Sequence, residues 1–362
     1  MGPLGLVVSA LVLSTWSVLV FAAQPAVRGS NKAGSAATPA QLLSRAADAS
    51  RTTDFKGVLV YRGSGAMEVL SVVHRYEKGV QSEHLVTLTG TPRELIRQGD
   101  RVICILPRDE HFQLRQPQVK SLFARLDPQA LSRISRWYQL EELPPARVAG
   151  RECLGVAVNP RDDYRYGYQV WLDKLTGVPL RVVLVGRNGE PLEQMMFTQV
   201  SFPKHIPDSA FRSRIAPADG YHVVHQTVPA RHASASAERA AQKSGPVLWQ
   251  FGALPPGFQV TVHDRRRQPG GSFVDHVMLS DGLSSVSVFS TRLQPGDKDL
   301  EGLSHIGAVH AYGRTLDGYH VTVVGEAPQR TVRAVGDAIE PLASSSVTAP
   351  AMAATVPAIA AP

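Results

Sequence analysis

Histidine and cysteine are the side chains of this chain with the chemistry to bind a metal or to act as a base or nucleophile. No Cys or carboxylate accompanies the closely spaced histidines at zinc-ligand spacing. We therefore expect these histidines on the surface or at the edge of a core, with no metal site. His222 and His225 are three residues apart, His305 and His310 are five apart, and His74 and His84 lie on neighbouring predicted strands.

The two cysteines, Cys104 and Cys153, each lie in a short apolar run typical of a strand. Neither has a neighbouring His that would activate it as a nucleophile. An oxidising compartment would permit a disulfide between them. A Cys104–Cys153 disulfide and two separately buried thiols both remain open.

The sequence lacks the common motifs of catalytic and nucleotide-binding sites. It holds no Gly-x-Ser-x-Gly, His-Glu-x-x-His, phosphate-loop or dinucleotide motif, and Gly302–Ile306 fails the first of these at its last position. The acidic pair Asp162-Asp163 precedes alternating tyrosines and is typical of a solvated turn. We expect no catalytic residue, no cofactor and no enzymatic activity.

The chain is basic, with 38 Lys and Arg, 31 Asp and Glu, and a formal net charge of +7. A nucleic-acid binder would concentrate its cations on one element. The one cluster here, Arg265–Arg267, precedes turn residues and is interpreted as a solvated loop, so no nucleic-acid partner is expected. Residues 44–225 hold 25 basic and 20 acidic side chains, an excess that favours anionic lipid or lipopolysaccharide phosphates.

The first 22 residues have the pattern of a secretory signal. Leu4 to Phe21 carry no charge, and Val20-Phe21-Ala22 offers the small residues of a cleavage site. Cleavage there would start the mature chain near Ala23 in the periplasm. No Lys or Arg precedes the apolar run, so an uncleaved membrane anchor is the alternative, since about 18 apolar residues can span a bilayer.

Composition divides the rest of the chain into two domains, as its length of 362 residues favours. Residues 23–37, 226–246 and 342–362 are rich in small and polar residues. They are predicted to be a disordered segment, a linker and a disordered tail. The domains between them span residues 38–225 and 247–341.

The first domain is predicted to hold a helix and then a series of strands. Thr38 and Gln41 form a capping box, which predicts a helix from Pro39 to about Ser50. The short apolar runs that follow are typical of an antiparallel sheet. A second helix is predicted over 128–138, and Asn188-Gly189 predicts a hairpin with a type I′ turn. The strands are predicted at 55–61, 68–76, 81–88, 93–98, 101–106, 110–114, 153–159, 166–173, 179–186 and 192–200.

The second domain is predicted to be a small α+β unit. Its apolar runs alternate with polar residues, and Asp281-Gly282 supplies a turn between two of them. A closing helix is predicted over 328–338. The strands are predicted at 258–264, 273–279, 285–291, 307–314 and 319–325.

Several separated motifs resemble known families. Trp171–Arg181, the Asn188-Gly189 hairpin and Met195–Val200 resemble the lipoprotein-carrier (LolA/LolB-like) superfamily. Further motifs are similar to both domains of the RseB/MucB family. These are Phe55–Tyr61, His74, Thr89–Arg97 and Cys104–Pro107 in the first domain, and Trp249, Leu254–Phe258, Leu279–Phe289 and Asp317–Pro328 in the second.

The resemblance implies a mainly β, α+β fold: an open half-barrel antiparallel sheet with helices, plus the smaller α+β domain. It also implies a periplasmic regulator that binds the periplasmic domain of an RseA/MucA-like anti-sigma factor. In such a family the regulator protects that domain from site-1 proteolysis and so represses an envelope-stress sigma factor, with lipid or lipopolysaccharide signals releasing the complex. A periplasmic lipid or lipoprotein carrier, and an interaction protein without a ligand, are the alternatives.

Two sets of residues are candidates for these contacts. For the partner they are Trp249, for which a core position is the alternative, and the exposed turn Ser280-Asp281-Gly282. For an acyl chain they form an apolar concavity of the first domain, for which simple core packing is the alternative. The concavity candidates are Val58, Val60, Leu70, Val72, Trp137, Trp171 and Val183, with further apolar side chains from the segment Leu122–Trp137.

Overall fold

The computed structural model describes residues 37–63, 65–107, 134–215, 220–227, 248–267, 271–294 and 301–342. The range Ala37–Pro362 forms one compact unit. The expected signal segment, the tail, most of the linker, the strand at 110–114 and most of the second predicted helix lie outside the described residues. Within the described ranges no helix is long and apolar enough to cross a membrane.

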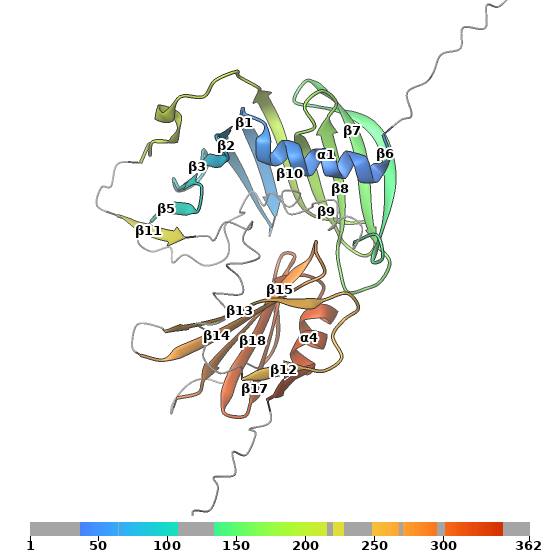
Figure 1. The fold of residues 1–362 in the computed structure, drawn as a ribbon, viewed down its shortest axis with the longest axis vertical. Helices are drawn as coiled ribbons and strands as arrows, with labels where there is room; N and C mark the ends of the chain where they lie inside the picture. Colours follow the sequence, from blue (N-terminus) through green and yellow to red (C-terminus); the bar gives the residue numbers. More distant parts are fainter. Residues whose placement is uncertain are drawn as a thin grey trace, which may run out of the picture. The chain divides into compact units, whose positions relative to one another are not determined.

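The predicted first helix is confirmed as α1 (Pro39–Thr52). The Thr38 hydroxyl accepts the Gln41 amide, and the Gln41 side chain accepts the Thr38 amide, so the capping box satisfies two free donors of the first turn. Leu42, Leu43 and three alanines are buried along one face. That apolar face packs on the β6 to β10 half of the sheet (Figure 1).

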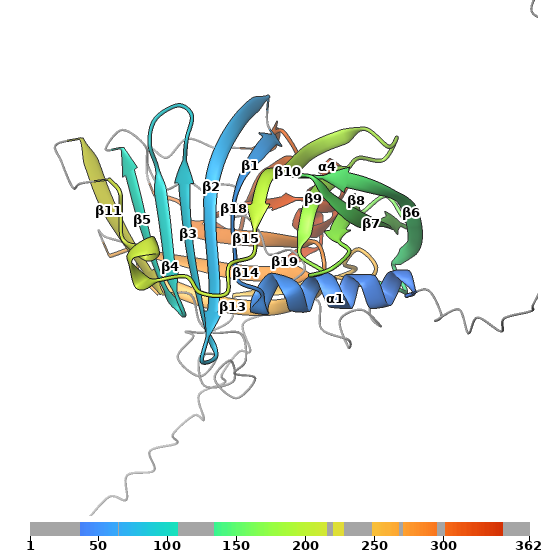
Figure 2. The same cartoon turned by 90° about the horizontal axis from the view of Figure 1, so that it is seen from above.

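Eleven antiparallel strands of the first domain form one curved sheet (Figure 2). β11 and β6 stand at its two ends, so the sheet is open, as the family resemblance implies. Its order is β11-β5-β4-β3-β2-β1-β10-β9-β8-β7-β6. The strands are β1 (Phe55–Gly63), β2 (Ala66–Glu77), β3 (Val80–Thr87), β4 (Glu94–Gln98), β5 (Arg101–Pro107), β6 (Tyr138–Val148), β7 (Arg151–Pro160), β8 (Gly167–Asp173), β9 (Pro179–Val185), β10 (Pro191–Ser201) and β11 (Tyr221–Thr227).

Strand β6 was not predicted from the sequence. It contains Pro144 and Pro145, which would remove hydrogen bonds from a central strand. β6 tolerates them because it is an edge strand, and its pairing with β7 shifts between Leu143 and Ala146. The residue Tyr138, expected at a helix end, instead begins this strand.

The turns of the sheet differ in part from the prediction. The hairpin at Asn188-Gly189 is present, but only Gly189 has a positive φ, so its turn is not type I′. A type I′ turn needs positive φ at both central residues. Three two-residue hairpins meet that condition, at Lys78-Gly79, Ala149-Gly150 and Asp317-Gly318.

The segment after β10 covers one face of strands β2 to β4. Ile206 and Phe211, the latter in the short helix η2 (Asp208–Phe211), are buried against Val73. The buried carboxylate of Glu94 accepts hydrogen bonds from the Ser213 hydroxyl and from two backbone amides beyond it. The opposite face of these strands therefore remains as the candidate for an apolar site.

The second domain has the predicted α+β form. Its six-stranded antiparallel sheet has the order β13-β14-β15-β18-β17-β16, and a short β12–β19 pair lies beside it. Val332 and Val335 of the closing helix are buried in the same core as the strands. The elements are β12 (Trp249–Phe251), β13 (Gln259–Arg267), β14 (Phe273–Ser280), β15 (Ser285–Arg292), β16 (Gly302–Ile306), β17 (Val309–Leu316), β18 (Tyr319–Glu326), α4 (Gln329–Asp337) and β19 (Ile339–Pro341).

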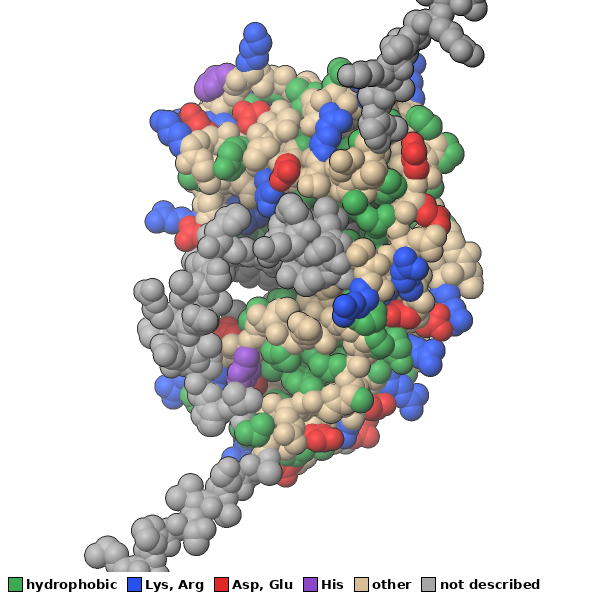
Figure 3. Space-filling view, turned by 45° about the vertical axis from the view of Figure 1, so that its right-hand side comes forward, with side chains coloured by type: hydrophobic (Ala, Val, Ile, Leu, Met, Phe, Trp, Pro, Cys, Tyr) green, Lys and Arg blue, Asp and Glu red, His purple; other side chains and the backbone are tan. Residues whose placement is uncertain are grey.

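The interpretation of Arg265–Arg267 as a solvated loop is wrong, because these residues form the end of strand β13. The guanidinium carbon of Arg265 lies 4.8 Å from the centre of the Phe273 ring on the neighbouring strand. On the face shown in Figure 3, basic and acidic side chains are interspersed. That surface does not have the single-sign stripe that a nucleic-acid binder uses.

Acid should weaken the first domain through Asp173, at the end of β8. Burial alone would raise the pKa of this carboxyl, but hydrogen bonds from Arg151 and Thr176 outweigh burial and hold the pKa below its usual value. The stabilisation is therefore present above about pH 4 and is lost as the pH falls through the folded-state pKa. Asp173→Asn should cost about 1.5–3 kcal/mol of unfolding free energy at neutral pH. Urea unfolding checks this at pH 7 and at about pH 3, where the gap between the two proteins should shrink; an equal gap at both would contradict it.

Candidate functional site

Strands β1 to β4 carry an apolar face. Leu59 pairs with Leu70, Val72 with Leu85, and Leu85 with Leu95, so these five side chains project from the same side of the sheet. We call them the β1–β4 apolar face. Four of the five are buried, and Leu95 is partly buried.

A small, shallow hollow with about 20 Å³ of accessible space, open to solvent, lies on this part of the sheet. Leu70, Leu85 and Leu95 form its apolar part. At its rim Arg93 forms an ion pair with Glu68, so the cation there is already compensated. The hollow has an apolar floor and a polar rim, but an acyl chain would have to widen it to bind.

The seven predicted groove residues do not line one surface. Val58 and Val60 pair with Ser71 and Val69, so they project from the face opposite to Leu70 and Val72. A one-residue offset along a strand moves a side chain to the other face, and placing these four together was wrong. Leu70, Val72, Trp171 and Val183 are buried in one hydrophobic cluster. Trp137 lies elsewhere, against Gly257 of the second domain.

Of the two alternatives for the cysteines, the structure has the separately buried thiols, because Cys104 and Cys153 are both free and buried, in β5 and β7. Burial raises the pKa of each thiol to about 11.

Both thiols should therefore be unreactive in the native protein, since the thiolate is the nucleophile. We expect a thiol-specific chromogenic reagent at pH 8 to label neither cysteine before denaturation and both afterwards. Prompt labelling of the native chain, or no labelling after denaturation, would contradict this expectation.

The histidine prediction is wrong for His74 and His84, which are buried within the sheet rather than at its edge. The ring nitrogen Nδ1 of His74 lies 2.8 Å from the carbonyl of Thr53, and that of His84 lies 2.8 Å from the carbonyl of Ala210. Each ring thus joins the sheet to a neighbouring segment. In the part of the chain that the structure describes, no three His, Cys, Asp or Glu side chains gather as a metal site.

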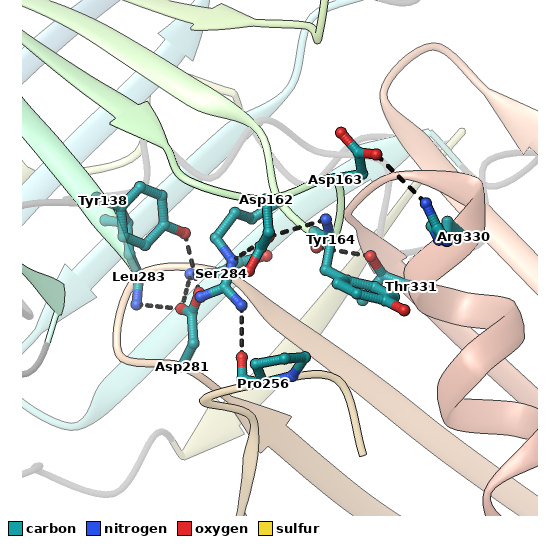
Figure 4. A network of polar contacts seen from close by, with 11 residues as sticks. Tyr138, Asp162, Asp163, Tyr164, Pro256, Asp281, Leu283, Ser284, Arg330 and Thr331 are labelled. Carbon is teal, nitrogen blue, oxygen red and sulfur yellow. Dashed lines mark hydrogen bonds and ion pairs between the residues drawn. The ribbon is translucent and has the colours of Figure 1, made fainter. Parts of the chain in front are cut away.

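The loop between β7 and β8 contacts the second domain, so interpreting its acidic pair as a solvated turn was wrong. Arg165 of this loop donates to Asp281 of the second domain over 2.7 Å. Both side chains have an exposed fraction of 0%. The same guanidinium donates to Asp162 in its own loop and to the carbonyl of Pro256. Figure 4 shows Asp281 beside Asp162 of the loop. Ion pairs this deeply buried are rare in proteins, because each charge must be fully compensated.

Each carboxylate oxygen of Asp281 accepts two hydrogen bonds. Its Oδ1 accepts the backbone amides of Leu283 and Ser284, and its Oδ2 accepts the Tyr138 hydroxyl as well as Arg165. Burial raises the pKa of Asp281, while the two amides and Arg165 act in the opposite direction. Burial, with the nearby Asp281 charge, also raises the pKa of Tyr138 far above its usual value. The Tyr138 hydroxyl therefore stays protonated and remains a donor.

Aromatic rings surround the guanidinium of Arg165. Its central carbon lies 5.3 Å from the ring centre of Trp137, 5.5 Å from that of Tyr138 and 5.4 Å from that of Phe258. Cation–π contacts of this kind stabilise a desolvated cation. Two of the rings belong to the first domain and one to the second, so the contact is built from both.

Further contacts flank this centre. The Thr331 hydroxyl donates to the carbonyl of Tyr164, and Arg330 forms an ion pair with Asp163. Leu283 and Ala308 of the second domain are buried in the same hydrophobic cluster as Leu42 and Leu43 of α1. The domains therefore share part of one core.

The predicted partner residues are less exposed than expected. Trp249 is 5% exposed, and its indole N–H donates to the Ser290 hydroxyl over 2.7 Å inside the core of the second domain. Asp281 faces Arg165, so the turn Ser280–Gly282 is not the exposed turn we expected. A contact of these residues with a partner chain stays a prediction.

Two family models match the chain in order. The MucB/RseB N-terminal domain covers residues 38–215, and the MucB/RseB C-terminal domain covers residues 243–340. The chain belongs to the MucB/RseB family. Curated relatives that are similar in sequence, and solved structures that are similar in fold, agree with that membership.

Among curated relatives, the sigma factor AlgU regulatory protein MucB of Pseudomonas aeruginosa is 32% identical over 86% of this chain and 93% of its own length. The sigma-E factor regulatory protein RseB of Escherichia coli K12 is 27% identical over 85% of this chain and 93% of its own.

Solved structures of this family superpose on both domains. MucB in the P. aeruginosa MucA/MucB complex has a TM-score of 0.65 and 30% identity, over 84% of this chain and 99% of that one. A crystal structure of MucB has a TM-score of 0.57 and 28% identity, over 83% of this chain and 97% of that one. The open sheet and the small second domain are thus the fold of this family.

Proposed function

We propose that this chain is a periplasmic regulator that binds the periplasmic domain of an anti-sigma factor. Bound there, it protects that domain from site-1 proteolysis and so represses an envelope-stress sigma factor. The observation that carries the proposal is the match of both MucB/RseB domains, in order, across this chain. The solved complex of a relative with MucA supports the choice of partner. The apolar run in the first 22 residues supports export.

Complex formation tests this proposal. The purified chain is titrated with the periplasmic domain of the anti-sigma factor encoded in the same genome, and binding is followed by calorimetry and by size-exclusion chromatography. We expect saturable binding and a co-eluting complex. A scrambled-sequence version of the anti-sigma domain serves as the control. Absence of binding to the native domain, with the chain folded by circular dichroism, would overturn the proposal.

The β1–β4 apolar face supports a lipid signal as the means of release. An acyl chain gains roughly 0.8 kcal/mol for each buried methylene, so about ten buried methylenes correspond to micromolar affinity. The excess of basic side chains in residues 44–225 attracts anionic head groups. Release requires that the lipid bind the partner-free form more tightly, because a ligand with equal affinity for both forms shifts nothing.

A lipid or lipoprotein carrier is the second candidate, favoured by the hollow beside Leu70. Native mass spectrometry of the chain purified from periplasm separates the two functions. A stoichiometric acyl species with no affinity for the anti-sigma domain would favour the carrier. Binding to the anti-sigma domain that lipid A displaces would favour the regulator.

A further inference from the structure

We propose that Arg165 and Asp281 form a latch that fixes the two domains in the arrangement that binds the partner. The latch consists of Arg165 with Asp162 from the first domain and Asp281 with Pro256 from the second. This inference rests on the proposed function for the identity of the partner. The latch itself rests on the hydrogen bonds of Arg165 to Asp162, Asp281 and Pro256, three residues that Figure 4 labels.

Each half of the latch is ordered by its own domain. Arg165 Nε donates to Asp162 over 2.9 Å within its loop. Asp281 is held by the amides of Leu283 and Ser284, over 2.8 and 2.7 Å, within its turn. Because both charges are positioned before they meet, they lose little side-chain entropy when they pair. The pair therefore selects one arrangement of the domains.

Separation of Arg165 from Asp281 would break contacts on both side chains. An opened latch would leave the aromatic contacts of Arg165 and part of the Asp281 hydrogen bonding to be replaced by water. A partly satisfied buried network is worse than a closed one, so intermediate arrangements in which the charges stay buried but unpaired are disfavoured. The latch should thus have two states, closed and hydrated, rather than a range of distances.

The backbone of the second domain approaches Trp137 of the first domain closely, and this approach further restricts the arrangement of the domains. Gly257, beside Pro256, has φ +83°, and a Cβ there would lie 2.3 Å from Nε1 of Trp137. Only glycine fits this position against the first domain. The second domain therefore meets Trp137 and Arg165 with its backbone, which requires one orientation.

The latch is also joined to the core under α1. Tyr138 donates to Asp281 and lies in the same buried cluster as Leu42 and Leu43 of α1. Tyr166, the residue after Arg165, is in that cluster too. A ligand that shifts α1 or β8 would therefore move latch residues directly.

The comparison structures favour the closed latch as the partner-binding state. The chain has a TM-score of 0.65 with MucB in the MucA/MucB complex and 0.57 with another crystal structure of MucB, at 84% and 83% coverage of this chain. Over its whole length, the chain is therefore the more similar to MucB in the complex. From this we infer that opening the latch lowers partner affinity.

The test uses the full chain and three variants. Arg165→Met removes the charge while keeping length, and the double variant Arg165→Met with Asp281→Leu replaces the pair by apolar groups, an exchange that often preserves stability. Arg330→Met is the matched control, because the Arg330–Asp163 pair joins the same domains but Arg330 is 61% exposed. Exposed pairs of this kind contribute little.

Two readouts are taken on each protein. Spin labels at Leu175→Cys and Ile306→Cys, one exposed site in each domain, report the distance distribution between the domains. The native cysteines are buried and stay unlabelled. Calorimetry reports the affinity for the anti-sigma periplasmic domain.

We expect a narrow distance distribution for the parent and Arg330→Met, and a broadened one for both Arg165 variants. Affinity should fall at least about tenfold in the Arg165 variants, as it does when about a tenth of the molecules are competent, and less than about twofold in Arg330→Met. If Arg165→Met alone fails to fold, the double variant supplies both readouts.

Three outcomes separate the latch from the proposed function. An unchanged distance distribution in the double variant would overturn the latch. A broadened distribution with parental affinity would overturn its coupling to the partner, while the proposed function stands. A parent chain that does not bind the anti-sigma domain would overturn the proposed function, and the coupling with it, and the distance data would still decide whether the latch fixes the domains.

Discussion

Replacing Trp249 by Ala should lower the free energy of unfolding of the second domain by about 3–5 kcal/mol. The indole is 5% exposed, packs edge-on to Tyr319 with ring centres 5.4 Å apart, and donates to Ser290. Truncation leaves a cavity and an unpaired buried hydroxyl. A loss of this size is a large part of the stability of a small domain.

Urea unfolding followed by far-ultraviolet circular dichroism measures this loss. Trp249→Phe is the control, since it keeps a ring in the core and removes the hydrogen bond, at a cost of about 1–1.5 kcal/mol for the bond. A loss below about 1 kcal/mol for Trp249→Ala would contradict the core position. It would return this residue to the partner surface on which the sequence analysis placed it.

Adjacent residues of strand β1 should respond very differently to truncation. Leu59 is fully buried on the β1–β4 apolar face, whereas Val60 projects from the opposite face and is only partly buried. Leu59→Ala should cost about 2.7–5 kcal/mol of unfolding free energy, as other buried leucines do. Val60→Ala should cost under about 1 kcal/mol.

The same pair of variants tests which face binds lipid. Lipid A binding, followed by tryptophan fluorescence, should weaken in Leu59→Ala under conditions where that variant is folded, and stay unchanged in Val60→Ala. Equal costs in stability would contradict the register of β1 with β2. Weakened binding in Val60→Ala alone would place the lipid on the other face.

The local features of this fold could be predicted from the sequence because short-range chemistry determines them. The capping box at Thr38 and Gln41 predicts the start of α1, and it is confirmed. The closing helix, predicted over 328–338, is confirmed as α4. These elements have start signals within a few residues of one another, which a single sequence can show.

The face of the sheet from which each side chain of strand β1 projects could not be predicted in the same way. Val58, Leu59 and Val60 are three apolar residues in a row, so alternation does not tell which face each occupies. The register with β2 settles it, and that register depends on a neighbouring strand. The groove residues chosen from sequence were therefore divided between two faces.

The Arg165–Asp281 ion pair could not be predicted from the sequence, for a different reason. The two residues are 116 positions apart and belong to different domains. Locally, each looks like part of a polar turn. A signal was present in the loop, where aromatic and charged residues alternate over Asp162–Tyr166, but one sequence does not show what such a loop faces.

Protection of the anti-sigma domain from cleavage tests the central claim most directly. The periplasmic domain is digested by the site-1 protease with and without this chain at ten times its dissociation constant, and intact domain is followed over time. Only about one-eleventh of the domain is then unbound, so the account predicts an approximately elevenfold slower cleavage. Cleavage at the unprotected rate, with the complex shown to be present by size-exclusion chromatography, would contradict it.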